Sequence, residues 1–148
     1  MKVTLCILVI VLTNHFAAAQ SLDSMMLKDA EVPQGYKKST ELICATPHAC
    51  SLYDQVDLYE SLLGKVTTKT FQSYNKKGDK GSILYFEFDK PFTAQGFLNG
   101  LLWGNETKPS RAEPDEYFAK GKMLIIWSFN LKSEIKQISK AKIQQLMQ

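Results

Sequence analysis

The chain has 148 residues, of which 45% are hydrophobic and 11% aromatic, with only 8 glycines and 5 prolines. This composition excludes an intrinsically disordered chain, a collagen and a coiled coil. The 18 basic and 15 acidic residues leave a net charge of +3. So weak a charge, carried by scattered basic residues, gives no reason to expect a nucleic-acid partner.

The first 19 residues have the pattern of a secretory signal peptide. Lys2 precedes a short apolar run, and the small residues Ala17-Ala18-Ala19 precede Gln20. The run is too short to span about 30 Å of hydrocarbon, and no later stretch is long and apolar enough to do so. We therefore predict cleavage between Ala19 and Gln20, and a single globular domain over residues 20–148. We expect it to be secreted or periplasmic, with no transmembrane segment in the mature protein and a bacterial host preferred.

Cleavage there changes which residues can carry chemistry. Cys6 and His15 are lost, so Cys44 and Cys50 become the mature cysteines and His48 the mature histidine. An odd cysteine count becomes an even pair, which suits an oxidising compartment.

The first elements of the mature chain are a short edge strand and a helix. The strand is expected within Tyr36–Ile43. The helix is predicted over 47–63, with Thr46 as its N-cap, Pro47 at its first position and Gly64 at its end. Its inward face is read from apolar residues at helical spacing, which are Ala49, Leu52, Tyr53, Val56, Tyr59 and Leu63.

A β-hairpin is predicted over about 65–89. Its two strands, 65–74 and 82–89, flank a polar turn over 75–81 that contains two glycines. The first strand is rich in β-branched residues. The second alternates between two sets, Ile83, Tyr85 and Glu87 on one face and Leu84, Phe86 and Phe88 on the other.

The last three elements are a helix over 92–103, a strand over 122–129 and a helix over 133–147. The strand is apolar on both faces, so it is expected to be buried and central. Ser133 is the predicted cap of the last helix. Its inward residues are predicted to be Ile135, Ile138, Ile143 and Leu146, and its outward residues Lys136, Lys140 and Lys142.

This order of elements predicts an α+β fold. We expect a small, mostly antiparallel twisted sheet, containing the hairpin and the buried third strand, with about three helices packed on it.

The segment Cys44-Ala-Thr-Pro-His48-Ala-Cys50 carries the most suggestive chemistry. A disulfide between Cys44 and Cys50 would fix the chain's entry into the following helix, and this is the preferred interpretation. The alternative is a small metal-binding or thiol-redox protein centred on Cys44, His48 and Cys50. The cysteine spacing matches neither a zinc knuckle nor the usual redox pair, which weighs against it.

Catalysis finds little support. A serine triad would have to use His48, and no Gly-x-Ser-x-Gly turn presents a serine. Paired carboxylates such as Glu87 with Asp115 or Glu116 cannot be placed across a cleft from sequence. The sequence favours a non-catalytic protein without a cofactor.

The segment Asn105–Gly121 is a long predicted loop, and long loops in compact domains are often functional. We predict a binding surface formed by Trp103, Lys108, Arg111 and Tyr117, with a modest groove lined by Trp103 and Tyr117. The partner would be an unknown protein or a small ligand. The alternative is that the aromatic rings complete the core, with a short helical turn after Pro114. Asn105-Glu-Thr is also a glycosylation acceptor if the host is eukaryotic.

Overall fold

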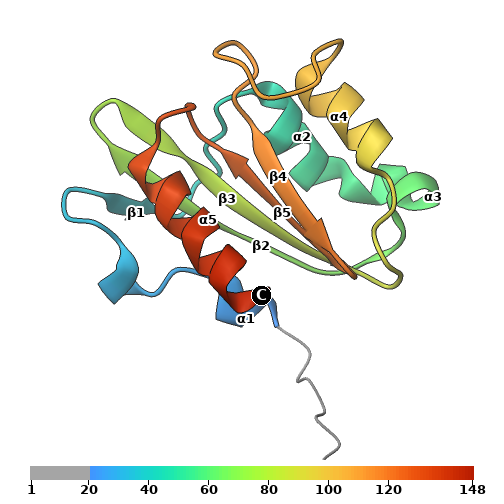
Figure 1. Ribbon diagram of the computed structural model, residues 1–148, viewed down its shortest axis with the longest axis horizontal. Helices are drawn as coiled ribbons and strands as arrows, with labels where there is room; N and C mark the ends of the chain where they lie inside the picture. The colour runs from blue at the N-terminus through green and yellow to red at the C-terminus, as the bar shows by residue number, and fades with distance from the viewer. Residues whose placement is uncertain (1–20) are drawn as a thin grey trace, which may run out of the picture.

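The computed structural model describes residues 21–148, so the predicted signal peptide lies outside the described residues. One antiparallel sheet, in the order β1-β2-β3-β5-β4, is flanked by helices on both faces (Figure 1). This confirms the predicted α+β class and its hairpin. The strands are β1 (Lys37–Ser39), β2 (Val66–Lys76), β3 (Asp79–Phe88), β4 (Glu116–Lys120) and β5 (Met123–Ser128). The helices are α1 (Leu22–Met25), α2 (Pro47–Gln55), α3 (Glu60–Leu63), α4 (Gln95–Trp103) and α5 (Glu134–Leu146), with 3-10 turns η1 (Asp29–Glu31) and η2 (Val56–Tyr59).

The two long strands of the hairpin form the backbone of the sheet. They pair from Val66↔Phe88 to Lys76↔Asp79, so the turn is tighter than predicted and has Gly78 at a φ of 79°. Beside the turn, a Cβ on Gly81 would lie 2.0 Å from the carbonyl oxygen of Ser128. Glycine at 81 therefore allows β3 to approach the end of β5.

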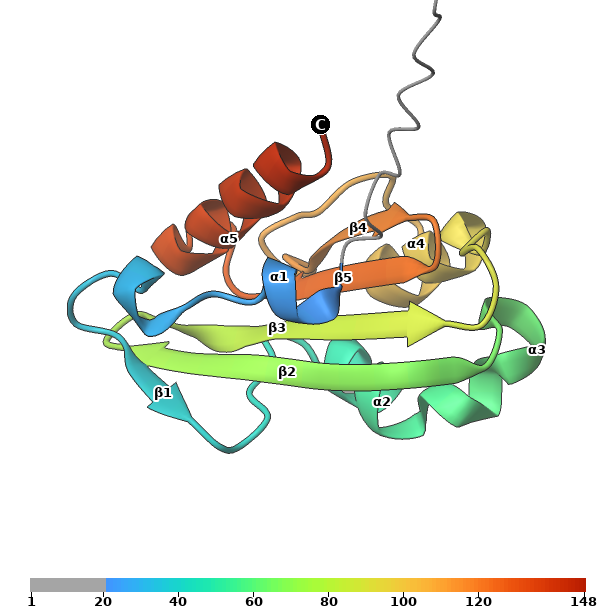
Figure 2. The same ribbon diagram turned by 90° about the horizontal axis from the view of Figure 1, so that it is seen from below.

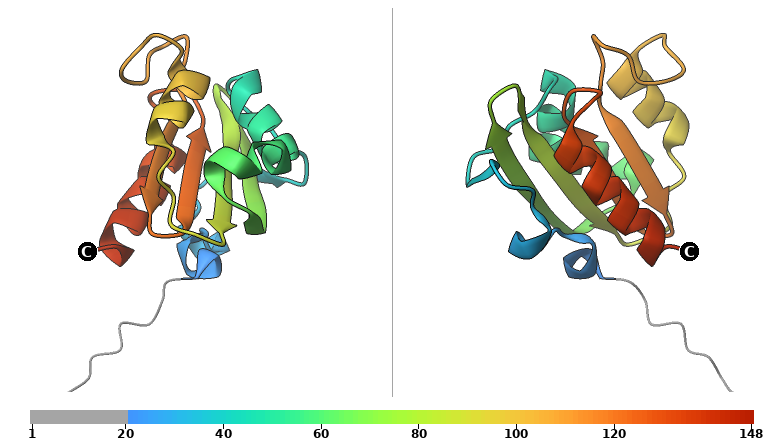
Figure 3. Two further views of the ribbon diagram at one scale, coloured as in Figure 1. Left: turned by 90° about the vertical axis from the view of Figure 1, so that its right-hand side faces the viewer. Right: turned by 60° about the vertical axis from the view of Figure 1, so that its left-hand side comes forward.

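The alternation predicted along β3 divides the core into two layers. Leu84, Phe86 and Phe88 face a cluster formed with α2, η2, α3 and α4. Ile83 and Tyr85 face a second cluster formed with α1 and α5. Figures 2 and 3 show the sheet lying between these two groups of helices.

The N-terminal segment that contains Leu27 is attached, by a buried glutamine, to the face of the sheet that α1 and α5 cover. The Gln72 side-chain amide accepts from the Leu27 N–H at 2.9 Å and donates to its carbonyl at 2.8 Å. The Tyr85 hydroxyl donates to the same Gln72 oxygen at 2.8 Å. These bonds hold Leu27, which is 3% exposed, in the core next to Met25.

The third predicted strand is interior, as expected, because β5 lies between β3 and β4. The helical turn expected after Pro114 is wrong. Glu116–Lys120 instead pairs with β5 as an antiparallel edge strand, from Glu116↔Trp127 to Lys120↔Met123. The connection before it therefore ends at Asp115 and is shorter than the loop predicted up to Gly121.

The helix predicted over 47–63 is broken into α2, η2 and α3. Pro47 does begin α2 and Gly64, with a φ of 95°, does end α3. Thr46 occupies the N-cap position, but its side chain makes no capping hydrogen bond. The helix expected over 92–103 begins at Gln95.

The C-terminal helix α5 has the predicted Ser133 cap, which accepts from the Lys136 N–H at 3.3 Å. The prediction that Lys136 points outward is wrong. Its side chain is 0% exposed, and its Nζ lies 2.5 Å from a carboxylate oxygen of Glu116. Because Glu116 begins the unpredicted strand β4, sequence periodicity alone could not reveal this buried charge.

None of the helices in residues 21–148 combines the length and the apolar character needed to cross a membrane.

Candidate functional site

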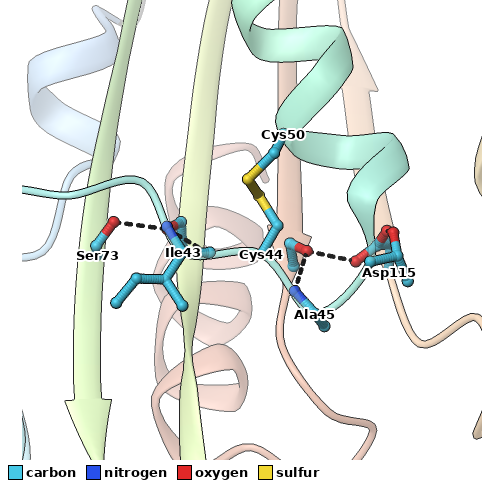
Figure 4. Close-up of a disulfide and its surroundings, with 9 residues drawn as sticks. Ile43, Cys44, Ala45, Cys50, Ser73 and Asp115 are labelled. Atoms are coloured by element: carbon cyan, nitrogen blue, oxygen red, sulfur yellow. Dashed lines mark hydrogen bonds between the residues drawn. A yellow bond between two sulfur atoms is a disulfide. The ribbon is translucent and has the colours of Figure 1, made fainter.

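The predicted disulfide is present. The sulfur atoms of Cys44 and Cys50 are 2.11 Å apart and their Cα atoms 5.8 Å apart (Figure 4). Cys50 lies in the first turn of α2 and Cys44 in the chain that enters it. The bridge therefore joins the start of α2 to the segment that crosses the end of the sheet.

A row of hydroxyl groups holds this crossing segment against the strands. Ser82 of β3 accepts from the Ile43 N–H at 3.0 Å and donates to the Ile43 carbonyl at 2.5 Å. Ser73 of β2 contacts the Ser82 hydroxyl at 2.6 Å. Further along, the Ala45 N–H donates to Ser128 of β5 at 2.8 Å. Figure 4 shows this row beside the disulfide.

The row ends on Asp115, a carboxylate with no solvent exposure. Ser128 donates to one of its oxygens at 2.6 Å, and the Thr46 hydroxyl donates to the other. Burial raises the pKa of Asp115 above its ordinary value of 3.8, while the bonds from Ser128 and Thr46 act in the opposite direction. This use of the Thr46 hydroxyl explains why it does not cap α2, and it makes Asp115 an anchor for the crossing segment.

The metal alternative has no ligand set in the described residues. Both sulfur atoms are bonded to each other, and His48 is exposed on α2. Across residues 21–148 no group of three or more His, Cys, Asp or Glu side chains could hold a metal ion.

The two predicted aromatic residues of the binding surface contact each other. The rings of Trp103 and Tyr117 stack with their centroids 5.7 Å apart, and both are half-buried against the first core cluster. The Trp103 indole N–H donates to the Asp115 carbonyl at 2.8 Å, and the Tyr117 hydroxyl donates to Asn99 at 2.7 Å. Their polar atoms are thus engaged within the protein, and neither ring lines the hollows described next.

The two predicted basic residues lie on the connection between α4 and β4, and both are exposed. Arg111 lines a hollow of about 580 Å³ together with Asn130, Leu131 and Lys132, the residues that connect β5 to α5. Lys108 does not line it. The structure therefore divides the four predicted residues. Trp103 and Tyr117 form an aromatic pair, Arg111 lines the hollow, and Lys108 does neither.

A second hollow, of about 460 Å³, adjoins the first through Asn130. It is lined by the hairpin turn and by the crossing segment, with Ala45, Asn75, Lys76, Lys77, Gly78, Asp79 and Lys80. Asn130 fixes the relation between the two hollows. Its amide donates to the Gly78 carbonyl at 3.1 Å, and its side-chain oxygen accepts from the Lys132 N–H at 3.1 Å.

The charge around these hollows is unbalanced. Lys76 is paired with Glu134 at 3.2 Å. The Asp79 carboxylate accepts from the hydroxyls of Tyr36 and Ser133. The remaining basic side chains, which we call the basic surface, form no ion pair within residues 21–148; they are Lys77, Lys80, Arg111 and Lys132.

The sequence points to Arg111 but not to the other three residues of the basic surface. Lys77 and Lys80 belong to the predicted hairpin turn, and Lys132 to the connection before the last helix. Only the pairing of β3 with β5 brings these segments to one end of the sheet.

Comparison with protein-family models, curated proteins and solved structures finds no match to this chain.

Proposed function

We propose that this chain is an exported, non-catalytic binding domain whose partner or ligand is acidic. The observation that carries the proposal is the convergence of four unpaired basic side chains, from three separate segments, on two adjoining hollows. The signal-peptide pattern and the Cys44–Cys50 disulfide support an oxidising, extracytoplasmic location.

The residue types suit carboxylate, sulfate or phosphate groups. The guanidinium of Arg111 can present two parallel N–H donors to one such group. The three lysines act as flexible point charges around it. Asn130 uses one amide N–H and its side-chain oxygen within the protein, and these bonds keep the lining of the two hollows in place.

The first hollow also has an apolar side. Leu131 is 38% exposed between Arg111 and Lys132. A purely ionic ligand would leave this side chain in water. The site is therefore better matched by a partner that presents apolar groups among its acidic ones.

A labelled acidic peptide that contains glutamate and leucine tests the proposal by fluorescence anisotropy. We expect the protein to bind it at low ionic strength, and the double variant Arg111→Glu/Lys132→Glu to bind at least about tenfold more weakly. Lys122→Glu is the matched control, since Lys122 is exposed and does not line either hollow. No binding by the unaltered protein, or an equal loss in the control, would contradict the proposed site.

The location is tested separately. Mass spectrometry of protein recovered from the medium or periplasm should show an N-terminus at Gln20. Recovery only from the cytoplasm, with Met1 retained, would contradict export.

A further inference from the structure

A second surface of this protein carries exposed leucines and acidic side chains, so its charge is opposite to that of the basic surface. In the turns that follow α2, Leu58 is 75% exposed and Leu62 is 52% exposed. Asp54, Asp57 and Glu60, on the same consecutive turns of chain, are also exposed. We call these five residues the acidic surface. None of these three carboxylates forms an ion pair within residues 21–148, and exposed apolar side chains rimmed by polar ones indicate a contact site.

The two surfaces lie at opposite ends of the sheet. The acidic surface precedes Val66, where β2 begins, whereas the basic surface surrounds the hairpin turn at the other end of the same strand. Figure 1 shows α3 and the hairpin turn at the two ends of the long strands. One copy therefore cannot bring its own two surfaces together.

The exposed large hydrophobic side chains of residues 21–148 are Leu58, Leu62 and Leu131. Two belong to the acidic surface and the third lines the basic hollow. Each surface thus combines apolar side chains with charges opposite to those of the other. This match of both apolar groups and charge identifies the partner more closely than charge alone.

We infer that the acidic partner of the basic surface is a second copy of this chain, docked head to tail. Leu58 and Leu62 of one copy would enter the hollow of about 580 Å³ beside Leu131 of the next. Arg111 and Lys132 would then lie against the carboxylates of the acidic surface. This inference rests on the proposed function, because it names the partner of the same site.

The contact is heterologous, since two different surfaces meet. A docked pair has one free acidic surface at one end and one free basic surface at the other. Association therefore continues into open chains unless the rotation between copies closes a ring. The interface is built around a few side chains and solvent-exposed charges. We therefore expect it to be weak and to weaken further with salt, because exposed charges are screened beyond about 10 Å at 0.1 M.

Sedimentation velocity on the chain expressed in full and purified with its disulfide intact tests the inference. We expect the mean sedimentation coefficient to rise with protein concentration at 50 mM salt and to fall towards the monomer value at 500 mM. Two variants each reverse one surface, namely Asp54→Lys/Asp57→Lys and Arg111→Glu/Lys132→Glu. Each should remain monomeric alone, with an apparent Kd at least about tenfold higher.

Mixing the two variants is the decisive measurement. The unaltered surface of each then meets its natural complement, and the two reversed surfaces are complementary to each other. The mixture should therefore associate although neither variant does so alone. Asp23→Lys and Lys122→Glu are the controls, since both residues are exposed and lie outside the two surfaces. They should associate like the unaltered protein, and near-ultraviolet circular dichroism confirms that every variant is folded.

Failure of this inference can be told apart from failure of the proposed function. An unaltered protein that stays monomeric at all concentrations, but binds the acidic peptide through Arg111 and Lys132, overturns self-association alone. A protein that neither associates nor binds the peptide overturns both. Association that is lost on reversing one surface but unaffected by the other also overturns the head-to-tail arrangement.

Discussion

The buried ion pair between Lys136 and Glu116 makes a strong prediction about stability. The Lys136 side chain is 0% exposed, and its Nζ makes no hydrogen bond of ordinary geometry within the described residues. The Glu116 carboxylate at 2.5 Å is therefore the group that compensates its charge. Glu116 is 22% exposed and also pairs with Lys140 at 2.9 Å.

Glu116→Gln removes the acid's charge and leaves the shape of its side chain almost unchanged. Uncompensated burial of a charge after loss of its partner typically costs about 3–5 kcal/mol. Because Glu116 retains some solvent contact, we expect the lower end, about 3 kcal/mol, and a melting temperature lower by roughly 10 °C. Lys136→Met removes the buried charge instead and leaves Glu116 paired with Lys140. It should stay within about 1 kcal/mol of the unaltered protein or stabilise it.

The pH dependence follows from the pKa of Glu116. Burial acting alone would raise this pKa, but the ion pairs with Lys136 and Lys140 outweigh burial and hold it below its ordinary value of 4.5. The folded-state pKa is thus lower than the unfolded one. The stabilisation is fully present above pH 4.5 and is lost as the pH falls through the folded pKa. The difference between the unaltered protein and Glu116→Gln should therefore shrink in acid.

Urea unfolding at several pH values measures these effects. The control is Asp29→Asn, which removes an ion pair of 2.7 Å with Lys38 at the surface, and it should change stability by less than about 1 kcal/mol. The reasoning is refuted if Glu116→Gln costs no more than this control, or if Lys136→Met is as destabilising as Glu116→Gln.

Three further predictions concern the packing and the crossing segment. Gly81→Ala should lower the free energy of unfolding by about 1–3 kcal/mol in urea, because its Cβ would overlap a β5 carbonyl. Gly100→Ala has open space around it in α4 and should stabilise the protein by up to about 1 kcal/mol. Equal effects of the two substitutions would contradict this account. Replacing Cys44 and Cys50 by serine should lower the free energy of unfolding by about 2 kcal/mol from loop entropy, and adding reductant to the unaltered protein should reproduce the loss. Asp115→Ala should cost about 1–3 kcal/mol because two hydroxyl donors lose their acceptor. Since burial raises the pKa of Asp115, its ionised form opposes folding at neutral pH. Asp115→Asn should therefore lower the free energy of unfolding much less than Asp115→Ala does. Equal losses for the two variants in calorimetry would count against this account.

Local sequence signals were sufficient for the elements whose stability is mostly local. Alternating residues along 82–89, with a glycine-containing turn before them, predicted the hairpin because strand side chains point to opposite faces. Pro47 and Ser133 mark helix starts because the fixed φ of proline and the side-chain cap of serine both act at the helix end itself. The disulfide followed from two cysteines close together in a chain with a signal-peptide pattern.

Tertiary structure alone decided the elements and sites that depend on distant partners. Glu116–Lys120 carries no strong strand pattern, and it becomes a strand because the edge of β5 offers hydrogen-bond partners. That pairing places Glu116 beneath α5 and so buries Lys136, which helical spacing had placed in solvent. In the same way, Arg111, Lys132 and the lysines of the hairpin turn are far apart in sequence and meet only because β5 pairs with both β3 and β4. Local residue patterns therefore predict the class of fold and the disulfide, whereas the pairing of distant strands fixes which charges are buried and where the basic surface lies.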